Sequence, residues 1–120
     1  MGHVKVSFKR RRDLRQGSPH QVCDLELGGA WRPRLERGGW LDVTARSPDG
    51  RFVGLVRWDR RGDTPGFRVV VLDTRSERVH RSRRFSGSCR ALTWSGDGFD
   101  WVTSAARGGR YKPLPLTPAG

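Results

Sequence analysis

The stretch Phe67-Arg68-Val69-Val70-Val71-Leu72 is almost continuously apolar, with Arg68 as its only polar residue. A strand with one solvated face alternates apolar and polar residues, whereas a short apolar run without alternation is typical of a strand covered on both faces. The run is also far too short to cross a bilayer, which takes about 20 apolar residues in a helix. We therefore predict that residues 67–72 lie in the interior of a sheet.

The sequence on either side of this stretch is divided into short segments. Aromatic and β-branched residues recur between clusters of Gly, Pro, Asp and Ser, at a spacing of about 8–12 residues that is typical of all-β proteins. We predict an antiparallel β-meander of about eight short strands in a single domain over residues 1–104, and an irregular tail rich in Gly and Pro over 105–120. The nine segments from which these strands are predicted cover residues 3–8, 22–27, 31–36, 40–46, 51–58, 67–72, 77–85, 89–94 and 99–104.

Three segments carry more specific expectations. Residues 9–17 are strongly basic, and we expect a loop or a short helix there. Pro33 has no amide hydrogen, so residues 31–36 should form an edge strand. Residues 77–85 contain four arginines that leave little to bury, so this strand should be an exposed edge whose charges oppose aggregation.

Two predicted turns share the pattern Ser-x-Asp-Gly. Ser47-Pro48-Asp49-Gly50 and Ser95-Gly96-Asp97-Gly98 each lie between two predicted strands, and they begin at residues 47 and 95, 48 residues apart. In such turns the aspartate caps its own backbone and the final glycine takes a left-handed conformation. The residues that we therefore predict to be structural are Asp49, Gly50, Asp97 and Gly98.

The order of segments after residue 40 resembles WD-repeat and Tol-type β-propeller repeats. In those repeats, Ser-Pro-Asp-Gly-Arg joins the first two strands of a blade and Asp-Thr-Arg-Ser lies between the outer two, as at residues 47–51 and 73–76 here. The spacing of 48 residues also fits one four-stranded blade. The resemblance covers residues 40–104, one blade and half of the next. It implies either a ring of several copies, or an open meander or small two-sheet sandwich with blade-like strands.

The charge of the chain indicates what kind of partner it has. The 120 residues include 24 Lys and Arg against 12 Asp and Glu, for a formal net charge of +12, and all but three of the cations are arginine. Such a field favours an anionic partner, which can be a nucleic acid, an acidic protein surface or an anionic membrane surface. Coding bias in a GC-rich genome is an alternative source of the arginine excess.

Arginines alternate with aromatic residues in two places, Arg57-Trp58-Asp59-Arg60-Arg61 and Arg81-Ser82-Arg83-Arg84-Phe85. Guanidinium groups pair with carboxylates or phosphates, and Trp and Arg are frequent anchors at protein interfaces. We expect a small module, an adaptor or an immunity-type inhibitor, that binds an acidic protein surface; nucleic-acid binding without sequence preference is the alternative, because Trp and Phe also stack on bases. Trp94 and Trp101 are expected in the core. The predicted partner-binding residues are Arg57, Trp58, Arg60, Arg61, Arg78, Arg81, Arg83, Arg84 and Phe85.

No motif in the sequence indicates catalysis or metal binding. A nucleophile elbow, a Walker loop and a His-Glu-x-x-His pattern are all lacking, and Cys23 and Cys89 are too far apart for a metal-ligand motif. We therefore expect that the protein is not an enzyme and that it binds no metal or cofactor. No signal peptide or membrane-spanning segment is visible, so the expectation is a cytoplasmic, bacterial protein without a membrane partner.

Overall fold

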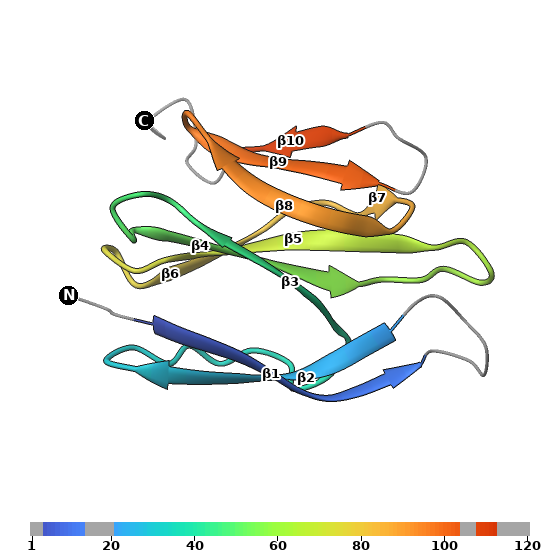
Figure 1. The fold of residues 1–120 in the computed structure, drawn as a ribbon, viewed down its shortest axis with the longest axis horizontal. Coiled ribbons are helices and arrows are strands. Elements are labelled where there is room, and N and C mark those ends of the chain that lie inside the picture. Colours follow the sequence, from blue (N-terminus) through green and yellow to red (C-terminus); the bar gives the residue numbers. More distant parts are fainter. Residues whose placement is uncertain (1–3, 14–20, 104–107, 113–120) are drawn as a thin grey trace.

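The computed structural model describes residues 4–13, 21–103 and 108–112, and within them the chain forms ten antiparallel strands and no helix (Figure 1). The larger sheet contains β1 (Val4–Asp13), β2 (Gln21–Gly29), β3 (Trp40–Arg46), β4 (Phe52–Trp58), β5 (Gly66–Asp73), β6 (Arg78–Arg81) and β7 (Phe85–Ser86). The smaller sheet contains β8 (Cys89–Ser95), β9 (Gly98–Thr103) and β10 (Gly109–Tyr111). Neighbouring strands follow chain order, except that β6 and β7 both pair with β5. The predicted all-β, antiparallel fold class is confirmed.

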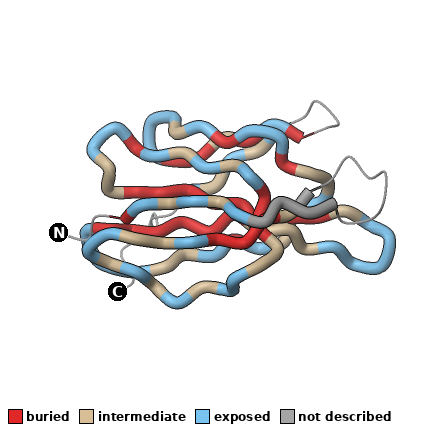
Figure 2. The backbone as a smooth tube through the Cα atoms, turned by 60° about the horizontal axis from the view of Figure 1, so that its bottom comes forward, coloured by how far each residue is buried: buried red, intermediate tan, exposed pale blue. Residues whose placement is uncertain are grey.

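The central strands β4 and β5 are covered on both faces, as the sequence predicted for residues 67–72. Cross-strand pairs share a face, so the apolar run of β5 is divided between two cores. The β8 core consists of Leu41, Phe52, Val56, Phe67, Val69, Val71, Cys89, Leu92, Phe99 and Trp101. The β1 core consists of Val4, Leu25, Trp40, Val53, Leu55, Val70 and Leu72. In Figure 2 the buried segments run through the middle of the molecule and the exposed ones lie at its periphery.

The smaller sheet lies over one face of the larger sheet, where β8 packs across β3 (Figure 1). Gly54 in β4 marks a close approach between the two sheets. A Cβ atom at this position would lie 2.7 Å from Leu92 Cδ2 and 2.8 Å from Phe99 Cε1. The absence of a side chain at residue 54 therefore lets these two apolar side chains pack directly on the backbone of β4.

The opposite face is covered by the β1–β2 hairpin and by the irregular segment that follows it. Residues 31–36 form no strand, so the predicted edge strand is wrong. The segment instead packs Trp31 and Leu35 against the β1 core. The hydrogen bonds that hold it to its neighbours include one from the amide of Leu25 to the carbonyl of Arg37 (2.7 Å) and one from Trp40 Nε1 to the carbonyl of Glu36 (2.6 Å).

Two other segments also differ from expectation. Residues 9–13 belong to β1 and pair with β2, with a register shift between Lys9 and Arg12, so no loop or helix begins at residue 9. Residues 14–17 of that predicted segment lie outside the described residues. The predicted irregular tail contains the strand β10, which pairs with β9. The rest of the tail, at residues 105–107 and 113–120, lies outside the described residues.

The predicted strand 77–85 is interrupted between β6 and β7. Arg81 pairs with Val70 while Phe85 pairs with Phe67, so the register changes by one residue. Buried Ser82 occupies the break, where its hydroxyl accepts a hydrogen bond from the amide of Val69 (2.8 Å) and donates one to the carbonyl of Arg83 (2.7 Å). Since a shift of one residue exchanges the faces of a strand, Phe85 turns toward the β8 core while Arg81 points to the other side.

The two Ser-x-Asp-Gly turns differ in geometry. In the first, the amide of Gly50 donates to the carbonyl of Ser47 (2.9 Å), and Gly50 has a φ of 75°, as predicted. The second is a two-residue hairpin in which Ser95 pairs with Gly98, and Gly96 has the positive φ of 64°. The predicted left-handed conformation of Gly98 is therefore wrong. Gly98 has a different constraint, because a Cβ atom there would lie 2.8 Å from the carbonyl oxygen of Tyr111.

Candidate partner-binding surface

The two arginine–aromatic segments of the sequence meet at one end of β5. Trp58 pairs with Phe67 from one side, and Phe85 pairs with Phe67 from the other. Arg84 joins the segments: its Nε donates to the carbonyl of Asp59 (2.8 Å), and its Nη2 donates to the carbonyl of Thr64 (2.9 Å). Arg84 is therefore a half-buried structural group and not the exposed charge that the sequence predicted.

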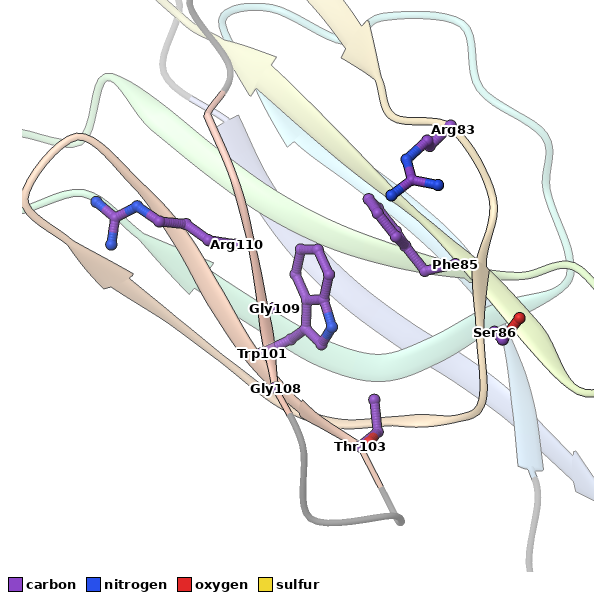
Figure 3. Close-up of a pocket in the computed structure, with 8 residues that line it drawn as sticks. All are labelled: Arg83, Phe85, Ser86, Trp101, Thr103, Gly108, Gly109 and Arg110. Carbon is purple, nitrogen blue, oxygen red and sulfur yellow. The ribbon is translucent and has the colours of Figure 1, made fainter.

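Close to this junction, Phe85 and Trp101 form the floor of an open pocket of about 460 Å³ (Figure 3). Their ring centroids are 4.5 Å apart, and the buried ring of Phe67 contacts both, at 5.8 Å from Phe85 and 5.6 Å from Trp101. The residues that line this Phe85 pocket are Arg83, Phe85, Ser86, Trp101, Thr103, Gly108, Gly109 and Arg110. They come from three places in the chain, namely β7 with the residues before it, β9 and β10.

The wall of the Phe85 pocket along β10 depends on two glycines. A Cβ atom at Gly109 would collide with the indole ring of Trp101, and one at Gly108 would collide with the carbonyl oxygen of Trp101. The absence of a side chain at Gly109 lets the indole extend across β10 toward Phe85, and the absence of one at Gly108 lets the backbone there approach the carbonyl of Trp101. Trp101 is 6% exposed and belongs to the core, as predicted, but its role in a pocket was missed. The requirement for Gly108 and Gly109 comes from Trp101, so no local signal in the tail could have revealed it.

The two arginines of the Phe85 pocket differ in their partners. Arg83 is exposed, and its guanidinium carbon lies 4.8 Å above the centroid of Phe85, a cation–π contact. Arg110 points away from the pocket in Figure 3 and donates to Asp97 and Asp100. The hydrogen bond from Arg110 is the main reason why the pKa of Asp97 lies below its ordinary value. The cationic side of the pocket is therefore provided by Arg83.

Two other predicted residues lie on the opposite face of the larger sheet and share one carboxylate. Arg57 Nε lies 3.3 Å from Glu36 Oε2, and Arg81 Nη2 lies 3.1 Å from Glu36 Oε1. Burial raises the pKa of Glu36, but its own backbone amide and the hydrogen bond and charge of Arg81 outweigh burial, so the pKa is lowered overall. Sequence reasoning missed Glu36, because it stood in a predicted strand with nothing nearby to indicate its partners.

The remaining predicted residues are dispersed. Arg60 and Arg61 are exposed in the loop between β4 and β5, and Trp58 is half-buried against the β8 core. Arg78 pairs with Asp73 at the far end of β5, away from Phe67. The predicted binding residues thus do not form one continuous face. Trp58, Arg83 and Phe85 lie around the Phe67 end of β5, whereas Arg57 and Arg81 lie on the other side of the sheet.

Comparisons with protein-family models, curated proteins and solved structures give no match to this chain. The resemblance to propeller repeats therefore stays a prediction. Among the described residues, no group of three or more His, Cys, Asp or Glu could hold a metal ion. The same part of the chain contains no helix of the length and hydropathy that a membrane crossing requires.

Proposed function

We propose that this protein is a small binding module, without catalytic activity, that engages an acidic protein partner through the Phe85 pocket. The observation that carries the proposal is the exposed guanidinium of Arg83 above the ring of Phe85, beside Trp101. Interface hot spots combine aromatic and arginine anchors in a pocket that excludes water. The net charge of +12 adds long-range attraction for a partner of the opposite sign.

The same surroundings favour a protein partner over a nucleic acid. Stacking of a base requires an aromatic ring with an open face. Trp101 is only 6% exposed, Phe85 lies between Trp101 and the guanidinium of Arg83, and Trp58 is half-buried. A side chain of a protein partner does not require the open face of an aromatic ring and can enter the pocket from its open side. Nucleic-acid binding is therefore the second candidate, supported by the net charge alone.

Affinity capture from a lysate of the source organism, with and without nuclease, tests the proposal. The partner should survive nuclease, and Arg83→Glu should weaken its binding by at least about tenfold. The melting temperature of this variant should stay close to that of the wild type, because Arg83 is exposed. Arg34→Glu changes an exposed arginine on the β1 side by the same two charges and serves as the matched control.

Salt dependence separates the two candidates. A protein interface should lose mainly association rate as salt increases, whereas phosphate binding should weaken steeply and log-linearly with salt concentration. Complete loss of binding after nuclease treatment would assign the activity to nucleic acid. Equal binding by the Arg83→Glu and Arg34→Glu variants would exclude the Phe85 pocket as the contact.

A further inference from the structure

The Phe85 pocket adjoins the free edge of a sheet. β10 pairs with β9 through three residues, and in the described part of the chain no strand pairs with its other edge. In Figure 3 the indole of Trp101 passes Gly109 and lies between β10 and Phe85, on the side away from β9. An edge strand presents a row of unpaired amide and carbonyl groups to which another extended chain can bind. Here such a row forms the rim of an aromatic pocket.

Two of the other sheet edges, those of β6 and β8, are less suited to this kind of pairing. β6 carries exposed arginines at both ends, Arg78 and Arg81, and charges of this kind protect an edge. β8 carries exposed Arg90 and a register shift between Cys89 and Ala91, which interrupts the regular row of backbone groups. Neither strand offers the combination found at β10, where backbone groups and an apolar pocket lie side by side.

The register of β10 defines what a docked strand would present. Gly109 pairs with Trp101, whose ring faces the β8 core, whereas Arg110 pairs with Asp100 and lies on the outer face. Because cross-strand neighbours share a face, a residue opposite Gly109 would point inward, toward the rings of Trp101 and Phe85 that line the pocket. Its two neighbours would point outward. The docked segment is thus expected to alternate, with an apolar residue inward and polar residues on each side of it.

We propose that an extended acidic segment of the partner adds to β10 as a fourth strand and inserts one apolar side chain into the Phe85 pocket. This inference rests on the proposed function and specifies the form of the partner. Main-chain hydrogen bonds provide affinity in this mode of recognition, and the pocket provides specificity. Arg83, the exposed cation that lines the pocket, attracts the acidic segment electrostatically, while the carboxylates that flank the inserted residue face outward. A second copy of this chain is disfavoured as the occupant, because each copy carries a net charge of +12.

A labelled peptide provides the test, with fluorescence anisotropy as the measurement. The probe is a peptide of about seven residues that alternates Glu and Val, so that valines occupy one face of a strand and glutamates the other. Wild-type protein should bind it, Arg83→Glu should bind it at least about tenfold more weakly, and Arg34→Glu should bind it like the wild type. Binding should also weaken as salt increases, because the attraction is electrostatic.

Two modified peptides distinguish strand addition from simple charge attraction. One carries N-methyl groups on its valine amides, and the other carries them on its glutamate amides. An added strand donates hydrogen bonds to its neighbour from every second residue, so one modified peptide should lose at least about tenfold in affinity while the other binds like the parent. If the two modified peptides bind with the same affinity as each other, strand addition is overturned and the proposed function is left intact.

Other outcomes also decide the matter. Failure of the parent peptide to bind at millimolar concentration would overturn this inference. A stable dimer in sedimentation that excludes the peptide would assign the edge to a second copy instead. Equal binding of the parent peptide by the wild type and Arg83→Glu would contradict the proposed function as well, because it removes the pocket cation from the interaction.

Discussion

The two faces of the central strands are covered in different ways. On the β8 side, a second sheet packs so closely that Gly54 has no space for a side chain, and the contacts between layers are apolar and aromatic. On the β1 side, a hairpin and an irregular segment form the cover, and polar contacts fasten it. Arg46 donates to the carbonyl of Val4 (2.7 Å), and Glu36 pairs with Arg57 and Arg81.

This difference shows how little the number of arginines says about a binding surface. On the β1 side, Arg57 and Arg81 share one carboxylate of the same chain, that of Glu36, which offsets part of their charge. Near the Phe85 pocket, Arg84 is used to fasten a loop, and Arg83 is the arginine that stays exposed above an aromatic ring. Some of the arginines that contribute to the net charge of +12 therefore have a structural role. Geometry, and not composition, separates them from the arginine that can meet a partner.

The largest expected effect concerns the close packing on the β8 side. Gly54→Val should destabilise the protein by about 3 kcal/mol or prevent folding, because its side chain would overlap Leu92 and Phe99. Unfolding in urea measures the change. Gly28→Val is the matched control in β2, where the nearest atom to a new Cβ is Lys5 Cβ at 3.8 Å. Similar losses of stability in both variants would show that the packing around Gly54 on the β8 side is no tighter than the packing around Gly28.

A smaller loss is expected at the junction of the two arginine–aromatic segments. Arg84→Met keeps an unbranched side chain but removes the hydrogen bonds to the carbonyls of Asp59 and Thr64, which should cost about 2 kcal/mol. Arg60→Met, at an exposed position in the same loop, should change the melting temperature very little. An unchanged melting temperature for the Arg84 variant would show that Arg84 contributes no more to stability than an exposed arginine does.

Substitutions in the two Ser-x-Asp-Gly turns should lower stability to a similar extent but should affect peptide binding differently. Gly50→Val should destabilise by about 1 kcal/mol, because valine is strained at a φ of 75°. Gly98→Val should have an effect of similar size for another reason, since its side chain would displace Tyr111 in β10. Binding of the alternating peptide should survive in the Gly50 variant and weaken in the Gly98 variant. Unimpaired peptide binding by both would show that β10 tolerates displacement.

The smallest effect concerns the carboxylate on the β1 side. The lowered pKa of Glu36 means that its ionised form stabilises the folded state above the ordinary value of 4.5, and that this contribution disappears as the pH falls through the lowered pKa. Glu36→Gln should therefore lower stability by about 0.5 kcal/mol at neutral pH, since the ion pairs are partly exposed, and by almost nothing in strong acid. Urea midpoints across this pH range measure the difference. A loss that does not depend on pH would assign the role of Glu36 to packing.

Local composition was sufficient where the local pattern determines the structure. The run at residues 67–72 revealed a strand with two covered faces, and Gly50 took the predicted conformation. The strand predicted at residues 31–36 is absent, because Trp31 and Leu35 reach the core although the backbone of this segment does not pair with a neighbouring strand. The interruption at Ser82 shifts the register by one residue and places Phe85 on the other face of the sheet. Residue composition alone does not predict such a shift. The candidate site was predicted only in part, because it depends on contacts between Trp101, Gly109 and Phe85 that are distant in sequence.

The contact between Gly66 and Arg84 has a consequence for evolution. A side chain at residue 66 would occupy the place of the Arg84 guanidinium, so residue 66 cannot gain one while Arg84 keeps its position. Loss of the arginine would release the constraint on the glycine, and a larger residue at 66 would expel the arginine. Among descendants of this sequence, arginine at 84 should therefore be inherited only with glycine at 66.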